Sequence, residues 1–257
     1  MLLSVELPWL LTTMLVSLRL GAVMLMTPVF ASLGMPLQVR VLLVLALSAT
    51  LVSGMTPGLV TTAAASAGNL ALAAANELVV GSLLAFALFA GFAAFQFAGR
   101  IMDIQMGFGV AGLLDPATRN HAPLLGMLLN LTAVLTFFLV GGHHLLLRGL
   151  AFSLERIPPG SGLTALPIGT VVGQFGAMFV FAALLAAPVM TVILLVDIGM
   201  AMMARTMPQM NVFIIGLPLK IFVGLVVLAI SLGFIAPAFA RVFDGLFTGW
   251  QKIITTH

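Results

Sequence analysis

The 257-residue chain has very little charge: only 7% of its residues are Asp, Glu, Lys or Arg. Water-soluble domains contain roughly a quarter charged residues. None at all occur between Ile157 and Val196, or between Val41 and Asn76. Such a chain cannot cover itself with a polar surface, so its composition excludes an ordinary soluble protein. Cysteine is also absent, which excludes disulfides and thiol chemistry.

What the chain has is apolar: 62% of its residues are hydrophobic and the mean hydropathy is +1.26. A bilayer admits only helices or a closed barrel, because every backbone amide must be satisfied internally. Barrel strands would alternate apolar and polar residues over about ten positions, whereas residues 42–47 read Leu-Leu-Val-Leu-Ala-Leu. The sequence therefore predicts an all-α polytopic membrane protein in lipid. The amino terminus lacks a basic region and a cleavage site, so no removable signal peptide is expected.

About six hydrophobic helices are predicted, separated by proline, glycine and polar residues. They are Pro8–Phe30, Leu37–Met55, Leu70–Ala98, Pro123–Leu147, Ile168–Arg205 and Val212–Pro237. Residues 148–167 are predicted to form a polar loop, and residues 241–257 a short amphipathic C-terminal tail. The fifth segment would be roughly 55 Å long, against a bilayer core of about 30 Å. Either Pro188 kinks it or part of it stands outside the lipid.

The topology of these segments is not predicted. With both termini in the cytoplasm, the inside loops and the outside loops would each hold four Arg or Lys residues. The usual excess of positive charge on the cytoplasmic side is therefore missing. Either one span boundary is misplaced, or the helices do not cross a bilayer as independent spans.

No enzymatic, metal or cofactor site is predicted. Residues 107–112 match G-x-G-x-x-G, but no predicted strand precedes them and the next acid is Asp115, so we interpret them as a flexible loop. His143 and His144 are adjacent and point about 100° apart on a helix, so they cannot chelate a metal as an i, i+4 pair would. No basic cluster is present that could bind nucleic acid.

Ionisable residues within apolar segments are the remaining candidates for function, since each costs at least about 2.5 kcal/mol facing lipid at the bilayer centre. They are Arg19, Glu77, Arg100, Asp103, Asp197 and Lys220. Two alternatives stay open. Glu77 or Asp197 binds a coupling ion in a transporter, or the acids form buried ion pairs with Arg19, Arg100 or Lys220.

Two segments go beyond composition. Residues 105–107 read Gln-Met-Gly and are followed by Asp115-Pro116, and residues 208–218 have the pattern Pro-Gln-x-x-x-Phe-x-x-Gly-x-Pro. Polar and proline residues rarely coincide at fixed places within apolar runs. Together with the opening Arg19-Leu20-Gly21 and Thr27-Pro28-Val29-Phe30, they make the chain resemble the FliR family of flagellar biosynthetic proteins and its injectisome (SctT) counterparts. The segment order agrees over nearly the full length.

The resemblance implies one membrane domain over residues 1–257, with helical hairpins lifted out of the usual membrane plane. It implies a subunit of the type III protein export gate in the bacterial inner membrane, at the flagellar basal body. Several copies of FliP and FliQ would assemble with it, FlhB would wrap the cytoplasmic side, and unfolded flagellar subunits would pass through. Neither a cofactor nor nucleic acid is expected.

The resemblance also implies that residues 106–120 plug the channel. Apolar side chains would exclude water, and glycines would let the loop move aside. We expect a stiffened loop to hamper export and a shortened loop to leak ions. The plug residues are Met106, Gly107, Phe108, Gly109, Val110, Gly112, Leu113, Leu114, Asp115 and Pro116; those of the second motif, interpreted as a helix break, are Arg205, Pro208, Gln209, Gly216 and Pro218.

Three alternatives compete with a flagellar export gate. A stand-alone secondary transporter or ion channel would be stable alone in detergent and show substrate-dependent flux. An injectisome gate subunit would share the same motifs. A structural membrane scaffold would tolerate loop mutations without a change in conductance.

Overall fold

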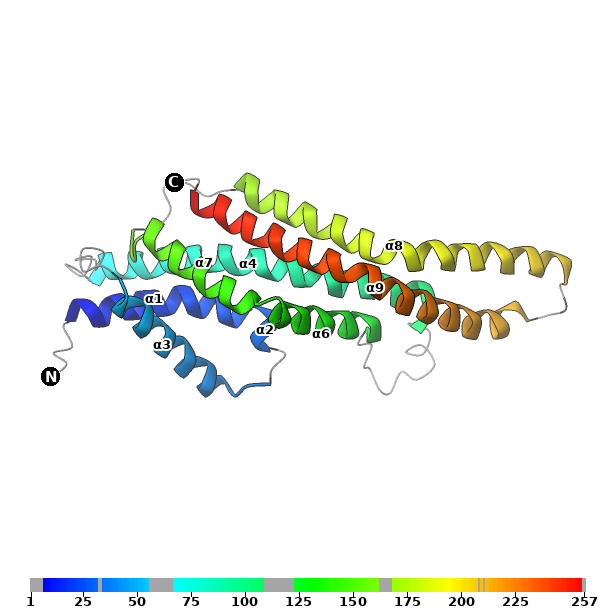
Figure 1. Ribbon diagram of the computed structural model, residues 1–257, viewed down its shortest axis with the longest axis horizontal. Helices are drawn as coiled ribbons and strands as arrows, with labels where there is room; N and C mark the ends of the chain where they lie inside the picture. Colours follow the sequence, from blue (N-terminus) through cyan, green and yellow to red (C-terminus); the bar gives the residue numbers. More distant parts are fainter. Residues whose placement is uncertain are drawn as a thin grey trace. The chain divides into compact units, whose positions relative to one another are not determined.

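The computed structural model describes residues 7–31, 34–55, 67–108, 123–161, 168–207, 209 and 211–255. Every regular element in these ranges is a helix, which confirms the all-α fold class (Figure 1). The helices are α1 (Leu7–Met26), α2 (Pro28–Ala31), α3 (Leu37–Ser53), α4 (Ala67–Met106), α6 (Leu124–Leu139), α7 (Gly142–Arg156), α8 (Ile168–Thr206) and α9 (Val212–Thr255).

Four described helices are long and apolar enough to cross a membrane. They are α1, α4, α8 and the Ile214–Gly233 part of α9. The pair α6 and α7 is bent by 71° and would make a fifth if counted as one span. The prediction of a polytopic membrane protein is confirmed, with fewer straight spans than the six segments suggested.

The fourth predicted segment and the polar loop after it are wrong in detail. The chain bends at Gly141, whose φ is +76°, and α7 then runs through the predicted loop to Arg156. Leu146, Leu150 and Leu154 are all buried. Their spacing of four places them on one helix face, so the burial of this stripe stabilises a helix in spite of the polar residues beside it.

The long helices also extend beyond the predicted ends. α4 continues to Met106 instead of ending near Ala98, and α9 continues through Pro237 to Thr255, so most of the predicted C-terminal tail is helical. Trp250 explains why the last turns of α9 are ordered: its side chain is buried, and its indole N–H donates to the carbonyl of Leu84 over 3.0 Å. α8 is a single helix that includes Pro188.

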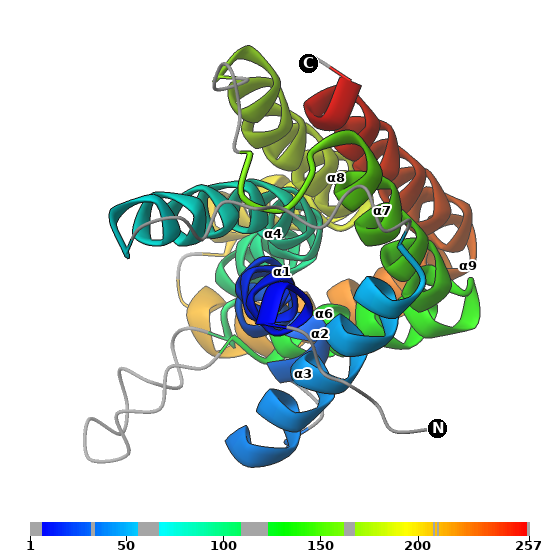
Figure 2. The same ribbon diagram turned by 90° about the vertical axis from the view of Figure 1, so that its left-hand side faces the viewer.

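The chain divides into two compact units, comprising residues 1–90, 137–175 and 243–257 in the first and 91–136 and 176–242 in the second. The prediction of one domain stays a prediction. In the first unit α1 lies between α3 and α4 (Figure 2). A Cβ atom on Gly81 of α4 would lie 2.7 Å from the carbonyl oxygen of Arg19 on α1. Glycine is therefore required for these two backbones to touch.

The second unit contains the end of α4, α6, most of α8 and the first part of α9. A close helix contact in this unit joins Gly99 of α4 to Gly126 of α6, where a Cβ atom on Gly99 would overlap the backbone of the other glycine. Small residues permit such close approach between membrane helices. The contact brings α4 and α6 together close to the loop that connects them.

Candidate functional site

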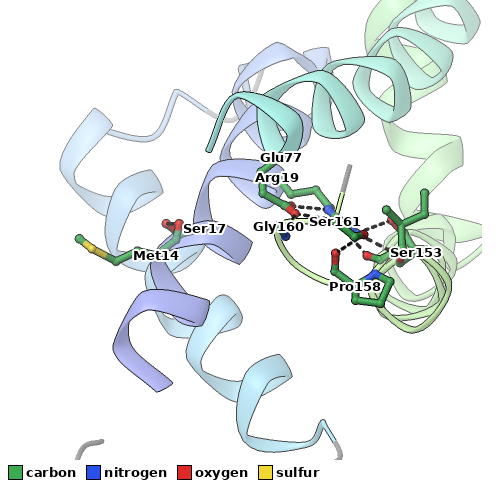
Figure 3. A network of polar contacts seen from close by, with 9 residues as sticks. Met14, Ser17, Arg19, Glu77, Ser153, Pro158, Gly160 and Ser161 are labelled. Carbon is green, nitrogen blue, oxygen red and sulfur yellow. Dashed lines mark hydrogen bonds and ion pairs between the residues drawn. The ribbon is translucent and has the colours of Figure 1, made fainter. Parts of the chain in front are cut away.

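The most buried polar cluster lies in the first unit and is built around Arg19 (Figure 3). Arg19 of α1 and Glu77 of α4 are both completely buried. The arginine Nε atom is 2.6 Å from Glu77 Oε2, and one Nη atom donates to Oε1 over 2.9 Å. This two-point contact is the strongest geometry for a guanidinium and a carboxylate. Of the two alternatives for Glu77, an ion pair with Arg19 is therefore present.

The same two side chains also bind the end of α7 and the turn after it. Arg19 donates to both oxygens of Ser153, at 3.1 Å and 2.9 Å, and to the carbonyl of Ile157 at 3.0 Å. Glu77 Oε1 accepts the N–H of Gly160 over 2.8 Å. Gly160 has a φ of +85°, a conformation that favours glycine. One buried ion pair thus joins three segments that lie far apart in the sequence.

A second ion pair joins Asp197 of α8 to Lys220 of α9, in the second unit. Both side chains are partly exposed, at 38% and 25%. Arg100, in contrast, was wrongly predicted to be buried. It lies with Gln96 and Ile104 on the exposed face of α4, where residues four positions apart fall on the same side.

Asp103 connects the two stems of the predicted plug loop. Its buried carboxylate accepts the backbone N–H of Leu125 at 3.1 and 3.2 Å, and that of Gly126 at 3.3 Å. These N–H groups belong to the first turn of α6, where no intrahelical acceptor is available. Asp103 therefore ties the end of α4 to the beginning of α6, immediately beside the Gly99–Gly126 contact.

The plug residues themselves are described only in part. Met106, the last residue of α4, is fully buried. A Cβ atom on Gly224 of α9 would lie 2.5 Å from its terminal methyl group, so the glycine leaves room for Met106. Gly107 follows with a φ of +88°, and Phe108 is partly exposed. Outside the described residues lie Gly109, Val110, Gly112, Leu113, Leu114, Asp115 and Pro116.

The helix break of the second motif lies between the fifth and sixth predicted segments, which end at Arg205 and begin at Val212. α8 ends at Thr206, one residue beyond Arg205, and α9 begins at Val212. Gln209 lies in this gap, while Pro208 lies outside the described residues. Gly216 and Pro218 do not mark the break, because both lie within α9. Gly216 instead makes room for the side chain of Met200 on α8.

In the part of the chain that the structure describes, no three His, Cys, Asp or Glu side chains come together as metal ligands. His143 and His144 lie at the start of α7 with ring centroids 4.1 Å apart. Sequence reasoning missed Ser153, Ile157 and Gly160, which contribute mainly through backbone atoms. The period-four leucine stripe of α7 is the sequence signal that could have indicated that this segment packs against other helices.

Comparison with known proteins shows which family and which relatives this chain is similar to. Residues 10–246 match the family model described as "Bacterial export proteins, family 1". The chain is 37% identical to flagellar biosynthetic protein FliR of Bacillus subtilis over 178 residues, which cover 67% of this chain and 68% of the relative. It is 28% identical to FliR of Aquifex aeolicus over 249 residues, 96% and 95% of the two chains. Yop proteins translocation protein T of Yersinia pestis is 32% identical over 155 residues, 59% of each chain.

Proposed function

The chain belongs to the bacterial export proteins of family 1 and is a membrane component of a type III export apparatus; from this premise we propose that it forms a gated channel with FliP and FliQ. The channel would carry unfolded flagellar subunits across the bacterial inner membrane at the flagellar basal body, with FlhB on its cytoplasmic side. The observation that best supports a gate is the Asp103 contact. It holds the end of α4 and the beginning of α6, which flank residues 107–123, at one point.

A segment whose two flanking helix ends are fixed in this way is well placed to act as a plug. Met106 is held in the core by α9, and the first turn of α6 is held by Asp103. The intervening residues begin with Gly107, whose positive φ turns the chain away from the α4 axis. A loop anchored at both ends can move aside for a substrate and return to the same position.

Apolar side chains on α8 and α9 leave a large surface that lipid or other subunits can cover. Large residues on α8 such as Leu184, Leu194 and Leu195 are exposed in the isolated chain. Of the most apolar stretch of α8 only 28% is buried within the chain, and of the most apolar stretch of α9 only 22%. Such surfaces are covered by lipid or by neighbouring helices, and neighbouring subunits of the proposed channel supply the latter.

The alternatives are less well supported. In a stand-alone transporter, Glu77 would need a free oxygen for a coupling ion, but Arg19 and Gly160 occupy its carboxylate. Asp197 is paired with Lys220. An injectisome gate would use the same geometry. The flagellar reading is favoured because a flagellar relative aligns over 96% of the chain, against 59% for the Yersinia protein.

Co-expression with FliP and FliQ tests this proposal. We expect purification through this chain, followed by native mass measurement, to give one discrete hetero-oligomer that contains one or few copies of it. A stable monomer or homo-oligomer that ignores both partners would contradict the proposal.

Shortening the loop tests the plug. Deletion of residues 110–114 is expected to raise the ion conductance of membranes that contain the assembled gate several-fold, because the apolar residues that exclude water are removed. Conductance is measured in cells or proteoliposomes under an applied potential. The matched control removes residues 61–65, an equally long stretch of the chain between α3 and α4, and should leave conductance unchanged. Normal conductance of the 110–114 deletion in a correctly assembled gate would count against the plug.

A further inference from the structure

An apolar groove of about 590 Å³ lies in the first unit between α1, α3 and α4. Its volume falls within the roughly 300–1,000 Å³ typical of small-molecule sites. Gly21, Leu25, Val44, Leu45 and Leu78 are among the residues that form its walls. Gly21 contributes to the gap, because the nearest atom that a Cβ atom there would meet is a Val44 methyl group 3.9 Å away.

The hydroxyl groups in the groove wall are already satisfied. Ser17 donates to the carbonyl of Met14 over 2.7 Å, and Ser82 donates to that of Val79 over 2.9 Å. Each bond lies within the serine's own helix, so neither hydroxyl needs a partner from outside. The groove therefore offers a hydrocarbon surface with almost no unsatisfied polar group along its walls.

Arg40 is the exception. Its side chain lines the groove from the first turn of α3. Its Nε atom is buried and has no hydrogen-bond partner, and among the described residues no carboxylate forms an ion pair with it. A buried donor without an acceptor is costly, and a cation in the first turn also opposes the helix dipole. An anion from outside the chain would supply the missing acceptor and offset the charge at this position.

We propose that this groove binds an anionic phospholipid, with an acyl chain along the apolar wall and the phosphate on Arg40. A guanidinium binds phosphate oxygens in a two-point geometry. The walls contributed by α1 and α4 belong to helices suited to span a membrane, so lipid has direct access. Basic pockets between membrane helices are recognised sites for anionic head groups. This inference does not depend on the gate proposal, since it requires only a membrane environment.

The test uses the full chain, purified with any partners that stay bound, and native mass spectrometry. The probes are phosphatidylglycerol and phosphatidylcholine with identical acyl chains. We expect preferential retention of phosphatidylglycerol. Arg40→Gln should reduce this retention about tenfold, because a charge-assisted hydrogen bond is lost. Gly21→Leu should also reduce it, by filling the apolar part of the groove while leaving the charge in place.

The matched control is Arg100→Gln, which removes the same charge from an exposed position on α4. It should leave phosphatidylglycerol retention unchanged. Equal retention of both lipids, or an equal loss in the Arg40 and Arg100 variants, would overturn the proposal. So would an assembled complex in which a photocrosslinker at Val41 captures a partner helix and no lipid, because a protein segment would then occupy the groove.

Discussion

Replacement of Glu77 by alanine is expected to destabilise the protein by about 3–5 kcal/mol, the usual cost of removing one partner from a buried ion pair. Arg19 would keep its hydrogen bonds to Ser153 and Ile157. Carbonyl and hydroxyl dipoles do not neutralise its charge, however, and the side chain has no access to water. The end of α7 and the Gly160 turn would lose an attachment at the same time. Thermal unfolding in detergent and resistance to limited proteolysis measure the effect.

Three variants separate the charge from the packing. Glu77→Gln keeps the shape and one acceptor oxygen and should be less harmful than alanine. A double Arg19→Leu, Glu77→Leu variant should recover much of the lost stability, because apolar residues in place of both charges leave no buried charge unpaired. Asp197→Asn breaks the partly exposed pair on α8 and α9 and leaves the Arg19 contacts intact, so it should not change the proteolysis of the α7 end and the Gly160 turn. A Glu77→Ala protein as stable as the unmodified one would refute the role assigned to the pair.

Replacement of Asp103 by alanine is expected to loosen the base of the plug loop. The first-turn N–H groups of α6 would lose their acceptor, and loss of such a helix cap costs about 0.5–2 kcal/mol. Because the stems would no longer be fixed at one point, we expect a several-fold rise in the ion conductance of the assembled gate together with reduced export of flagellar subunits. Conductance of proteoliposomes and secretion of a flagellar subunit by cells measure the two effects.

Two controls accompany the Asp103 variant. Asp103→Asn keeps one acceptor oxygen and should show a smaller change in both measurements. Arg100→Ala alters the exposed face of α4 less than one turn away and should show none. An Asp103→Ala gate that assembles at lower stability but conducts and exports normally would show that the Asp103 contact stabilises the protein and has no part in gating.

The sequence was sufficient for the class of fold but not for the ends of the helices. Uniformly apolar runs predict membrane helices whatever their partners are. The end of α4 was predicted at Ala98, immediately before Gly99 and Arg100, whereas Gly99 is a packing contact with Gly126 inside the helix. The end of α9 was predicted at Pro237, whereas the helix continues past Trp250, whose stabilising hydrogen bond comes from a residue distant in the chain.

The candidate site, like the fold, could be predicted from the sequence only in part. The cost of charge in lipid identified Arg19, Glu77 and Asp103 as residues that need partners. The sequence could not show which partners these residues have, because several pairings would balance the same charges. Within the described residues, Asp103 in fact binds backbone N–H groups and no basic side chain. Backbone donors exist at every position, so no sequence pattern distinguishes the ones that are free.

The spacing of the Arg19 contacts has a consequence for biogenesis. Glu77 lies 58 residues after Arg19, and Ser153 lies 134 residues after it. At roughly 5–20 residues per second of synthesis, the ribosome needs about 3–12 s to reach Glu77 after Arg19 has been made. During that interval α1 carries an unpaired guanidinium, a burden of about 2.5–3.5 kcal/mol at the bilayer centre. The pair with Glu77 forms only after α4 has been made, and we expect the final packing of α1 to wait for it.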